Sequence, residues 1–359
     1  MRIIDSDTWR IDFKLREPYT IAYDTYDSAT NLFVRLDTDT GLRGYGCASP
    51  APEVTGESIE ECAQSLEQLS SVAIGVDPRQ ERGPDLEAAS AATPAAAAAL
   101  DMALLDLRAR DANVPLCVML GGGPGSLITS VTLGIEPLEA TLARGRDQVA
   151  QGFRALKVKG GNDVDTDIAR ICGLRRELGP EIDMRFDANQ GYDVDAAVRF
   201  ARGVADANVV AFEQPTPASD SEGLAELTDR LRLRRREQRG IPPVLADESL
   251  LGVADAVELV AGNVVDGFTV KLMKAGGITP ARAIDQVAAT SGLPCMLSCM
   301  DEAALGIAAG LHFALAAKTI QWVDLDGHLD LLDDPTAAAV SLRDGRLTPG
   351  PGPGLGVQL

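Results

Sequence analysis

The second two-thirds of the chain alternates short apolar runs with amphipathic segments, and this pattern gives the clearest prediction of the fold. Eight apolar runs can be counted, and the steps between their ends are mostly 24 to 28 residues. One longer step, of 34 residues, contains the arginine-rich stretch 231–240. Strand–helix units repeated at this period are typical of a (β/α) barrel. The runs are 131–133, 155–159, 183–187, 209–213, 244–247, 267–271, 294–299 and 320–324.

The first third of the chain has a different pattern and predicts a separate α+β module. Two segments alternate polar and apolar residues as half-buried strands do, and Asp39-Thr40-Gly41 favours a hairpin turn. Thr93 and Pro94 suit the N-cap and the first position of a helix. We therefore expect strands over 10–13, 31–36 and 42–46 and helices over 58–70 and 95–110.

Together these patterns predict an α/β protein, a (β/α) TIM-type barrel preceded by an N-terminal α+β domain. We expect the N-terminal domain over 1–120, the barrel over 121–330, and a C-terminal segment, 331–359, that returns to the first domain. The alternative is an open doubly wound sheet, which would carry a Gly-x-Gly-x-x-Gly sequence after its first strand. The chain lacks that sequence there.

Composition narrows the classes of function. A net charge of −20 argues against binding to nucleic acid or an anionic membrane, and it permits a site that attracts cations. No apolar run reaches membrane-spanning length and the first residues show no signal-peptide pattern, so we expect a cytoplasmic protein. Six cysteines without a Cys-x-x-Cys pair favour reduced thiols. There are two histidines, and His312 lies in an apolar run as a core residue would, so histidine catalysis is not expected.

Lysine is scarce in this chain, and its distribution is uneven. There are six lysines among 33 basic residues, and four of the six fall in two short runs, Lys157-Val158-Lys159 and Lys271-Leu272-Met273-Lys274. An amine, unlike a guanidinium, can lose its proton near neutral pH when burial or a neighbouring cation lowers its pKa. The clustering suggests acid/base or Schiff-base chemistry. Two strand ends with solvated basic residues are the alternative explanation.

Polar residues occur where the apolar runs of the barrel finish. In a (β/α) barrel the carboxyl ends of all strands share one face, where active sites lie. Three carboxylates, Asp187, Glu213 and Asp247, should converge there, and either each has its own cationic partner or one divalent metal binds all three. The metal is the simpler explanation, and an all-oxygen ligand set points to Mg²⁺. The residues at the strand ends are Lys159, Asp187, Glu213, Asp247, Lys271 and Asp324.

Lys159 on the second strand and Lys271 on the sixth would face each other across this metal. Two bases on opposite faces of one carbon are what an epimerisation by 1,1-proton transfer requires. The resulting enediolate dianion needs electrostatic stabilisation, for which Mg²⁺ and the ammonium of Lys157 are suitable. Crowding Lys157, Lys159 and a metal together would lower the pKa of the base toward its working range.

These motifs resemble those of the enolase superfamily, in its muconate-lactonising-enzyme subgroup. The resemblance covers essentially the whole chain and implies an enolase-like modified barrel whose N-terminal domain caps the active site. It also implies Mg²⁺ on Asp187, Glu213 and Asp247, acid/base roles for Lys159 and Lys271, and a homo-oligomer. Asn189 would be a supporting group and Lys274 structural. The motifs are Lys157-Val158-Lys159, Asp187-Ala188-Asn189, Glu213-Gln214-Pro215, Asp247-Glu248-Ser249 and Lys271-Leu272-Met273-Lys274-Ala275-Gly276-Gly277-Ile278.

The eighth strand favours one activity within the subgroup. Asp324-Leu325-Asp326 places two carboxylates at i and i+2, which project the same way from a strand and could hold an ammonium group. An Asp-x-Asp here looks like the dipeptide epimerases, where the pair receives the substrate's α-ammonium. The two aspartates could instead be solvated acids in a turn. The alternative functions for the protein are an N-acylamino acid racemase or o-succinylbenzoate synthase, or a non-catalytic metal-dependent binding barrel.

Two departures from the Ala-Glu epimerases suggest a different dipeptide. Asp24, in the capping loop 18–26, stands where those enzymes carry an arginine for the glutamate side chain. Asp301, which follows Met300 after the seventh strand, stands where an apolar residue is typical. With Met300, Asp301 and Asp24 lining the pocket, the expected substrate is a dipeptide with a cationic side chain, Lys or Arg.

Overall fold

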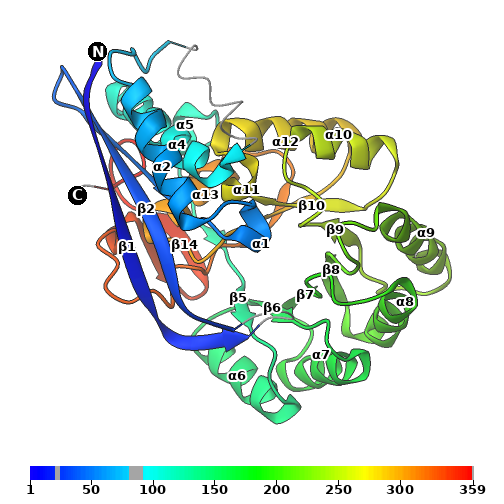
Figure 1. Ribbon diagram of the computed structural model, residues 1–359. Coiled ribbons are helices and arrows are strands. Elements are labelled where there is room, and N and C mark those ends of the chain that lie inside the picture. The colour runs from blue at the N-terminus through cyan, green and yellow to red at the C-terminus, as the bar shows by residue number, and fades with distance from the viewer. Residues whose placement is uncertain (21–24, 81–91, 358–359) are drawn as a thin grey trace.

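An eight-stranded parallel sheet forms the centre of the protein (Figure 1). The computed structural model describes residues 1–20, 25–80 and 92–357. The order of the strands follows the chain, and an isolated parallel bridge between Thr129 and Val323 joins the last strand to residues just before the first. The predicted (β/α) barrel is therefore confirmed. Its strands are β5 (Val131–Leu133), β6 (Ala155–Lys159), β7 (Asp183–Asp187), β8 (Val209–Glu213), β9 (Val244–Ala246), β10 (Gly267–Lys271), β11 (Cys295–Ser298) and β12 (Ile320–Asp324).

Helices cover the outside of this sheet, so most residues of its strands are buried. All five residues of β10 are buried, for example, which explains why the strands read as continuous apolar runs. Figure 1 shows the helices in a ring around the strands. They are α6 (Leu138–Ala150), α7 (Val164–Leu178), α8 (Val194–Gly203), α9 (Ser221–Glu237), α10 (Val253–Ala261), α11 (Leu272–Ala275), α12 (Ile278–Ser291) and α13 (Ala304–Ala314), with a 3-10 turn, η1 (Ala205–Ala207), after α8.

The N-terminal domain packs a three-stranded antiparallel sheet against helices, on the left of Figure 1. The long strands β1 and β2 pair along most of their length, and Trp9 stacks on Phe33 across the pair with ring centroids 5.4 Å apart. The helices predicted over 58–70 and 95–110 are present as α2 and α4. The elements are β1 (Ile3–Thr20), β2 (Thr25–Thr38), β3 (Arg43–Ala48), α1 (Pro52–Thr55), α2 (Ile59–Val72), α4 (Pro94–Asp111) and α5 (Leu116–Met119).

The N-terminus of α4 is capped differently from the sequence-based expectation. Thr93 occupies the N-cap position, but its side chain makes no capping bond and its hydroxyl contacts Ser65 Oγ at 2.6 Å. The buried Glu57 carboxylate instead accepts a hydrogen bond of 2.7 Å from the amide of Ala95. A side chain from the loop between α1 and α2 therefore completes the helix.

Asn31 and Ser49 connect the N-terminal sheet to a loop of the barrel. The side chain of Asn31, which is fully buried, donates to the carbonyl of Asp301 at 2.9 Å and accepts from the amide of Ala303 at 2.7 Å. The hydroxyl of Ser49 donates to the same Asp301 carbonyl at 2.9 Å. The backbone of the loop between β11 and α13 is therefore fixed by the N-terminal domain.

The C-terminal segment contacts the N-terminal helices. The amide of Leu355 donates to Asp106 Oδ1 of α4 at 2.7 Å, and Gly354 forms a bridge with Pro115 just before α5. These contacts agree with the return of 331–359 to the first domain, and the division at residues 120 and 330 remains our proposal. The segment holds η2 (Ala337–Ala339), β13 (Val340–Arg343) and β14 (Arg346–Pro349), and β14 also pairs with β4 (Leu127–Ile128).

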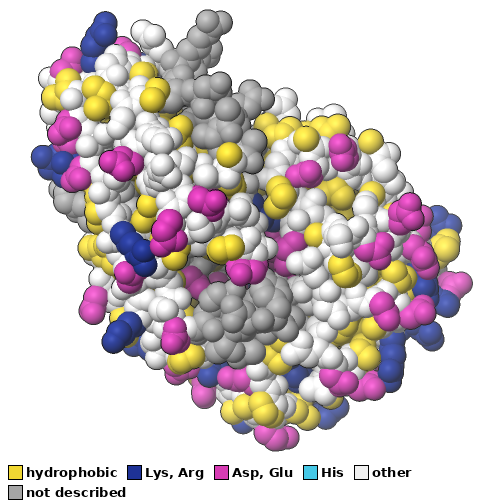
Figure 2. Space-filling view, viewed as in Figure 1, with side chains coloured by type: hydrophobic (Ala, Val, Ile, Leu, Met, Phe, Trp, Pro, Cys, Tyr) yellow, Lys and Arg dark blue, Asp and Glu magenta, His cyan; other side chains and the backbone are white. Residues whose placement is uncertain are grey.

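The surface and the thiols agree with the composition. Asp and Glu side chains are scattered over the visible face in Figure 2. No helix in the ranges described above combines the length and apolar character needed to cross a membrane. All six cysteines are free. His312 is buried, as expected of a core residue, and its Nδ1 accepts a hydrogen bond from the amide of Cys117.

Candidate active site

Three carboxylates converge at the carboxyl ends of neighbouring barrel strands. Asp187 ends β7, Glu213 ends β8 and Asp247 follows β9. Each is at most 1% exposed, and one oxygen from each lies within 4.8 Å of the others. Because parallel strands finish at the same edge of a barrel, residues that are far apart in sequence meet there.

Lys157 lies among these carboxylates. It projects from β6, is 2% exposed, and places its Nζ 3.1 Å from Asp187, 2.8 Å from Glu213 and 3.0 Å from Asp324. Burial alone would lower the pKa of Lys157, but the charges of Asp324 and Glu213 outweigh it, so the pKa stands well above its ordinary value. The side chain is therefore held as an ammonium.

Lys159 and Lys271 extend from opposite walls of the barrel. They end β6 and β10, which are four strands apart in a circle of eight. Lys159 Nζ lies 2.7 Å from Asp187 Oδ2, and Lys271 Nζ lies 2.7 Å from Asp247 Oδ2. The two amines thus flank the group of carboxylates, one at each end of it.

Burial and a neighbouring carboxylate have opposite effects on the pKa of Lys271. Burial lowers it, but the adjacent Asp247 carboxylate raises it by more, so that the pKa is above its ordinary value. The effect of the carboxylate is the larger because Lys271 touches Asp247 directly.

Lys274 and Gln214 fix Asp247, a contact that the sequence predicted for neither residue. Lys274 Nζ contacts the carbonyl of Asp247 and lies 2.5 Å from its Oδ1. Gln214 Oε1 accepts hydrogen bonds from the amides of Asp247 and Ser249, at 2.9 and 3.1 Å. The scarcity of lysine pointed to Lys274, but Gln214 stood out only as a member of its motif.

A divalent metal fits the carboxylates of this site. Asp187, Glu213 and Asp247 each pair with a lysine in this structure. Separate cationic partners, the alternative to a metal, are therefore present. Glu213 Oε1 is nevertheless buried without a hydrogen-bond partner. Burial raises the pKa of Glu213, and the neighbouring Asp187 charge raises it further. An unpaired oxygen beside two more carboxylates is a suitable donor set for Mg²⁺.

Asn189 and Glu248 lie beside this group. The amide of Asn189 donates to Asp187 Oδ1 at 2.9 Å, as a supporting residue would. Glu248 Oε1 accepts a weak hydrogen bond of 3.4 Å from the Asn189 side chain. Burial and the charge of Asp247 raise the pKa of Glu248 to about 7. Asp247, rather than Glu248, forms the close group of carboxylate oxygens with Asp187 and Glu213.

The two aspartates of the eighth strand have different surroundings. Asp324 is buried, and its oxygens accept hydrogen bonds from Ser130 at 2.5 Å, Ser298 at 2.8 Å and Lys157 at 3.0 Å. Asp326 follows the strand, is partly exposed, and accepts a hydrogen bond of 2.6 Å from the amide of Thr132. Asp326 is thus the more accessible of the pair.

The predicted specificity residues are only partly described. Met300 and Asp301 follow β11 and are partly buried. The amide of Met300 donates to the Glu302 carboxylate, and the carbonyl of Asp301 is held by Asn31 and Ser49. Asp24 lies outside the described residues.

Comparisons with known proteins agree with this fold and site. A family model described as Enolase C-terminal domain-like matches residues 140–359. Another, the Mandelate racemase / muconate lactonizing enzyme N-terminal domain, matches residues 4–121. The L-Lys-D/L-Arg epimerase of Methylococcus capsulatus is 42% identical over 363 residues, covering 99% of both chains. The hydrophobic dipeptide epimerase of Enterococcus faecalis is 37% identical over 92% of both.

A solved structure of a similar protein carries the metal and a dipeptide. It is the dipeptide epimerase from Methylococcus capsulatus complexed with Mg and the dipeptide L-Arg-D-Lys. The present chain matches it with a TM-score of 0.90 and 42% identity, and 99% of each chain is covered. The similarity therefore extends over the whole fold.

Proposed function

Because the chain belongs to the mandelate racemase/muconate lactonizing enzyme family of the enolase superfamily, we propose that it is a Mg²⁺-dependent dipeptide epimerase. Its named relatives are epimerases and racemases, and the protein is accordingly an isomerase. The observation that carries the proposal is the pair of lysines that reach the buried carboxylates from opposite walls of the barrel.

Asp187, Glu213 and Asp247 are the proposed ligands of the metal. They offer three oxygens close together, and the similar epimerases of Methylococcus capsulatus and Enterococcus faecalis were crystallised with Mg. When bound, Mg²⁺ supplies positive charge beside the substrate carboxylate, which makes the neighbouring α-proton more acidic. Lys157, held as an ammonium, adds a second positive charge to the same site.

Lys159 and Lys271 are the proposed acid and base. The neutral amine of one takes the proton from the α-carbon, the electron pair of the broken C–H bond stays on the substrate, and the ammonium of the other donates a proton to the opposite face. Two bases on two walls give inversion rather than return of the proton to the same face. In the reverse reaction the two lysines exchange roles.

A dipeptide with a cationic side chain, Lys or Arg, is the proposed substrate. Asp301 and Asp24 add negative charge on the loops assigned to the pocket, and the protein itself is acidic. The relative that shares 42% identity is named an L-Lys-D/L-Arg epimerase. Asp326, as the more accessible acid of its pair, receives the α-ammonium of the dipeptide, and Asp324 holds Lys157 in place.

Deuterium uptake tests this proposal. The protein is incubated with Mg²⁺ in D₂O against pools of L,L-dipeptides, and one-unit mass gains are read by mass spectrometry. Uptake should require Mg²⁺, stop on chelation, and favour dipeptides that contain Lys or Arg. Asp301→Asn keeps the size of the side chain and removes its charge, so it should lower the preference for cationic over apolar dipeptides.

Each part of the proposal has its own contrary outcome. Equal uptake by acidic, apolar and cationic dipeptides would exclude the charge-based preference and leave the epimerase chemistry. Uptake by N-acylamino acids instead of dipeptides would assign the protein to the racemases. Turnover that survives in both Lys159→Ala and Lys271→Ala would contradict the two-lysine mechanism.

A further inference from the structure

Arg170 of α7 is a fully buried arginine whose hydrogen bonds end at the active-site rim. Its Nε donates to Thr141 Oγ1 at 2.9 Å, and its Nη2 donates to the carbonyl of Gly134, just after β5, at 2.6 Å. Its Nη1 donates to the carbonyl of Lys159 at 2.7 Å and to Asp167 Oδ1 at 3.0 Å. One guanidinium thus ties the ends of β5 and β6 together.

Such a side chain is not needed for packing alone. A buried charge carries a desolvation cost, and well-packed apolar residues in place of a buried ion pair are often neutral or stabilising. What Arg170 adds is a rigid, planar set of donors that reaches several acceptors at fixed angles. It therefore specifies the position of the backbone that it binds, and that backbone belongs to Lys159.

Asp167 extends this constraint to the other side of the same turn. Its Oδ2 accepts hydrogen bonds from the amide of Gly161 at 2.9 Å and from the hydroxyl of Tyr192 at 2.6 Å. Gly161 has a φ of +106°, and a Cβ there would lie 2.2 Å from the carbonyl oxygen of Ala188. The turn after Lys159 is thus pressed against the next loop and held from both ends.

All of these contacts lie on the Lys159 side of the barrel. Arg170 and Asp167 bond to α6, to the ends of β5 and β6, and to the loop after β7. Lys271 ends β10, four strands away from β6. A shift of the Lys159 backbone also moves the amine at the end of its side chain. A displacement of a catalytic group by about 1 Å can lower the rate of reaction about 100-fold.

We propose that Arg170 and Asp167 are positioning residues for Lys159 alone, so that they control proton transfer on one face of the substrate. This inference rests on the proposed two-lysine function. It predicts a stereochemically one-sided defect. If Arg170 is altered, the epimer whose α-proton faces Lys159 should exchange that proton slowly. The epimer whose α-proton faces Lys271 should still lose its proton to Lys271 and receive a deuteron on the same face.

The test measures α-proton exchange in D₂O separately from each epimer of one dipeptide. Lys159→Ala and Lys271→Ala first identify which epimer depends on which lysine. Arg170→Lys should then reduce exchange from the Lys159-dependent epimer by about 10- to 100-fold and leave the other within about threefold. The thermal shift on addition of Mg²⁺ should stay at the wild-type value, because the carboxylates are untouched.

Arg175→Lys is the matched control. Arg175 lies on the same helix and also donates to backbone carbonyls, of Ala207, Gly179 and Ile182, but these are remote from the strand ends that carry the site. Exchange from both epimers should stay near wild type in this variant. If Arg170→Lys does not fold, Tyr192→Phe removes only one hydrogen bond of Asp167 and should show a smaller defect with the same one-sidedness.

Two results would overturn the inference and can be told apart. The first is a folded Arg170→Lys protein in which α-proton exchange falls equally for both epimers while the wild-type protein exchanges both. That result would show that Arg170 has only a general structural role. Wild-type protein that exchanges no dipeptide would overturn the proposed function, and this inference with it.

Discussion

Asp324 and Asp326 are two residues apart, yet their carboxyl groups differ in acidity. Burial raises the pKa of Asp324, but the charge of Lys157 and the hydrogen bond from Ser130 lower it by more, so that it lies below its ordinary value. Burial and the charge of Asp324 raise the pKa of Asp326 to about 7. One aspartate is thus ionised throughout the physiological range, and the other titrates within it.

Binding of the substrate should therefore depend on pH. Asp326 must be ionised to attract an ammonium group, and its charge appears as the pH rises through about 7. An α-amino group loses its own charge near pH 8. The KM for a cationic dipeptide should fall between pH 6 and about 7.5 and rise again above about 8. Steady-state kinetics across this range provide the measurement.

Asp326→Asn separates this effect from others. The amide keeps the shape of the side chain but does not ionise, so the acid limb of the KM profile should disappear while the alkaline limb remains. Persistence of the acid limb in this variant would assign it to another group, such as Glu248, whose pKa is also raised to about 7.

At the scale of single residues, the sequence predicted which residues belong to the candidate site. It did not predict which of them contact one another. Asp187, Glu213 and Asp247 could be grouped because each follows a barrel strand. The pairing of Lys157 with Asp324 joins residues 167 positions apart and depends on closure of the barrel. The contacts of Arg170 could not be predicted either, because they depend on backbone carbonyl groups, which every sequence supplies.

At the scale of elements, the repeated period of apolar runs predicted all eight barrel strands, and capping was harder to predict. A strand that is buried on both faces can be recognised from its own residues, which form a continuous apolar run. The cap of α4 instead comes from Glu57, 38 residues before the amide of Ala95 that it binds. Asp334 does the same for α13 by accepting a hydrogen bond of 2.6 Å from the amide of Ala304. Caps from outside the helix leave no local pattern.

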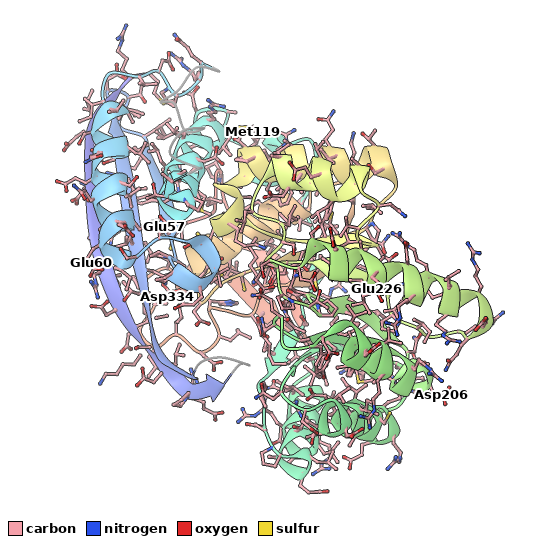
Figure 3. The ribbon with its side chains drawn as sticks, turned by 45° about the vertical axis from the view of Figure 1, so that its right-hand side comes forward. Glu57, Glu60, Met119, Asp206, Glu226 and Asp334 are labelled. Carbon is pink, nitrogen blue, oxygen red and sulfur yellow. The ribbon has the colours of Figure 1, made fainter. Side chains whose placement is uncertain are left out.

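Loss of the Glu57 cap should destabilise the protein. Glu57→Ala removes the acceptor at the N-terminus of α4 and leaves a buried amide unpaired, so the free energy of unfolding should fall by about 1–2 kcal/mol. Chemical denaturation at pH 7 measures this. Figure 3 shows Glu60 on the outer side of α2 and Glu57 on the side that faces the rest of the molecule.

Glu60→Ala is a suitable control for this prediction. Its side chain is 80% exposed and lies 3.8 Å from Arg10, so its removal should change stability by no more than about 0.5 kcal/mol. Equal effects of the two substitutions would show that Glu57 does not act as a cap.

At the scale of the whole molecule, charge is the dominant long-range feature. The chain has a net charge of −20, and acidic side chains are spread over the face seen in Figure 2. Like charges distributed over a surface repel one another and destabilise the compact state, and salt screens this repulsion. The exposed ion pairs, such as Arg199 with Asp165, contribute little by comparison.

Salt should therefore stabilise this protein. Raising NaCl from about 20 mM to about 500 mM shortens the Debye length several-fold, so the melting temperature should rise by a few degrees. Differential scanning calorimetry with Mg²⁺ held constant measures this, and KCl at the same ionic strength should act alike. A lower melting temperature at high salt would mean that the surface ion pairs outweigh the repulsion.

The contact between Asp106 and Leu355 has a consequence for how the protein is made. Asp106 is buried in α4 and accepts hydrogen bonds from the amide of Tyr45, from Arg110 and from the amide of Leu355. Leu355 is 249 residues further along the chain, which a ribosome takes roughly 12–50 s to synthesise. During that interval the first domain holds a charged side chain that lacks one of its partners. In a nascent chain, the part of α4 that Leu355 will contact should therefore remain exposed to chaperones until the whole barrel has been synthesised.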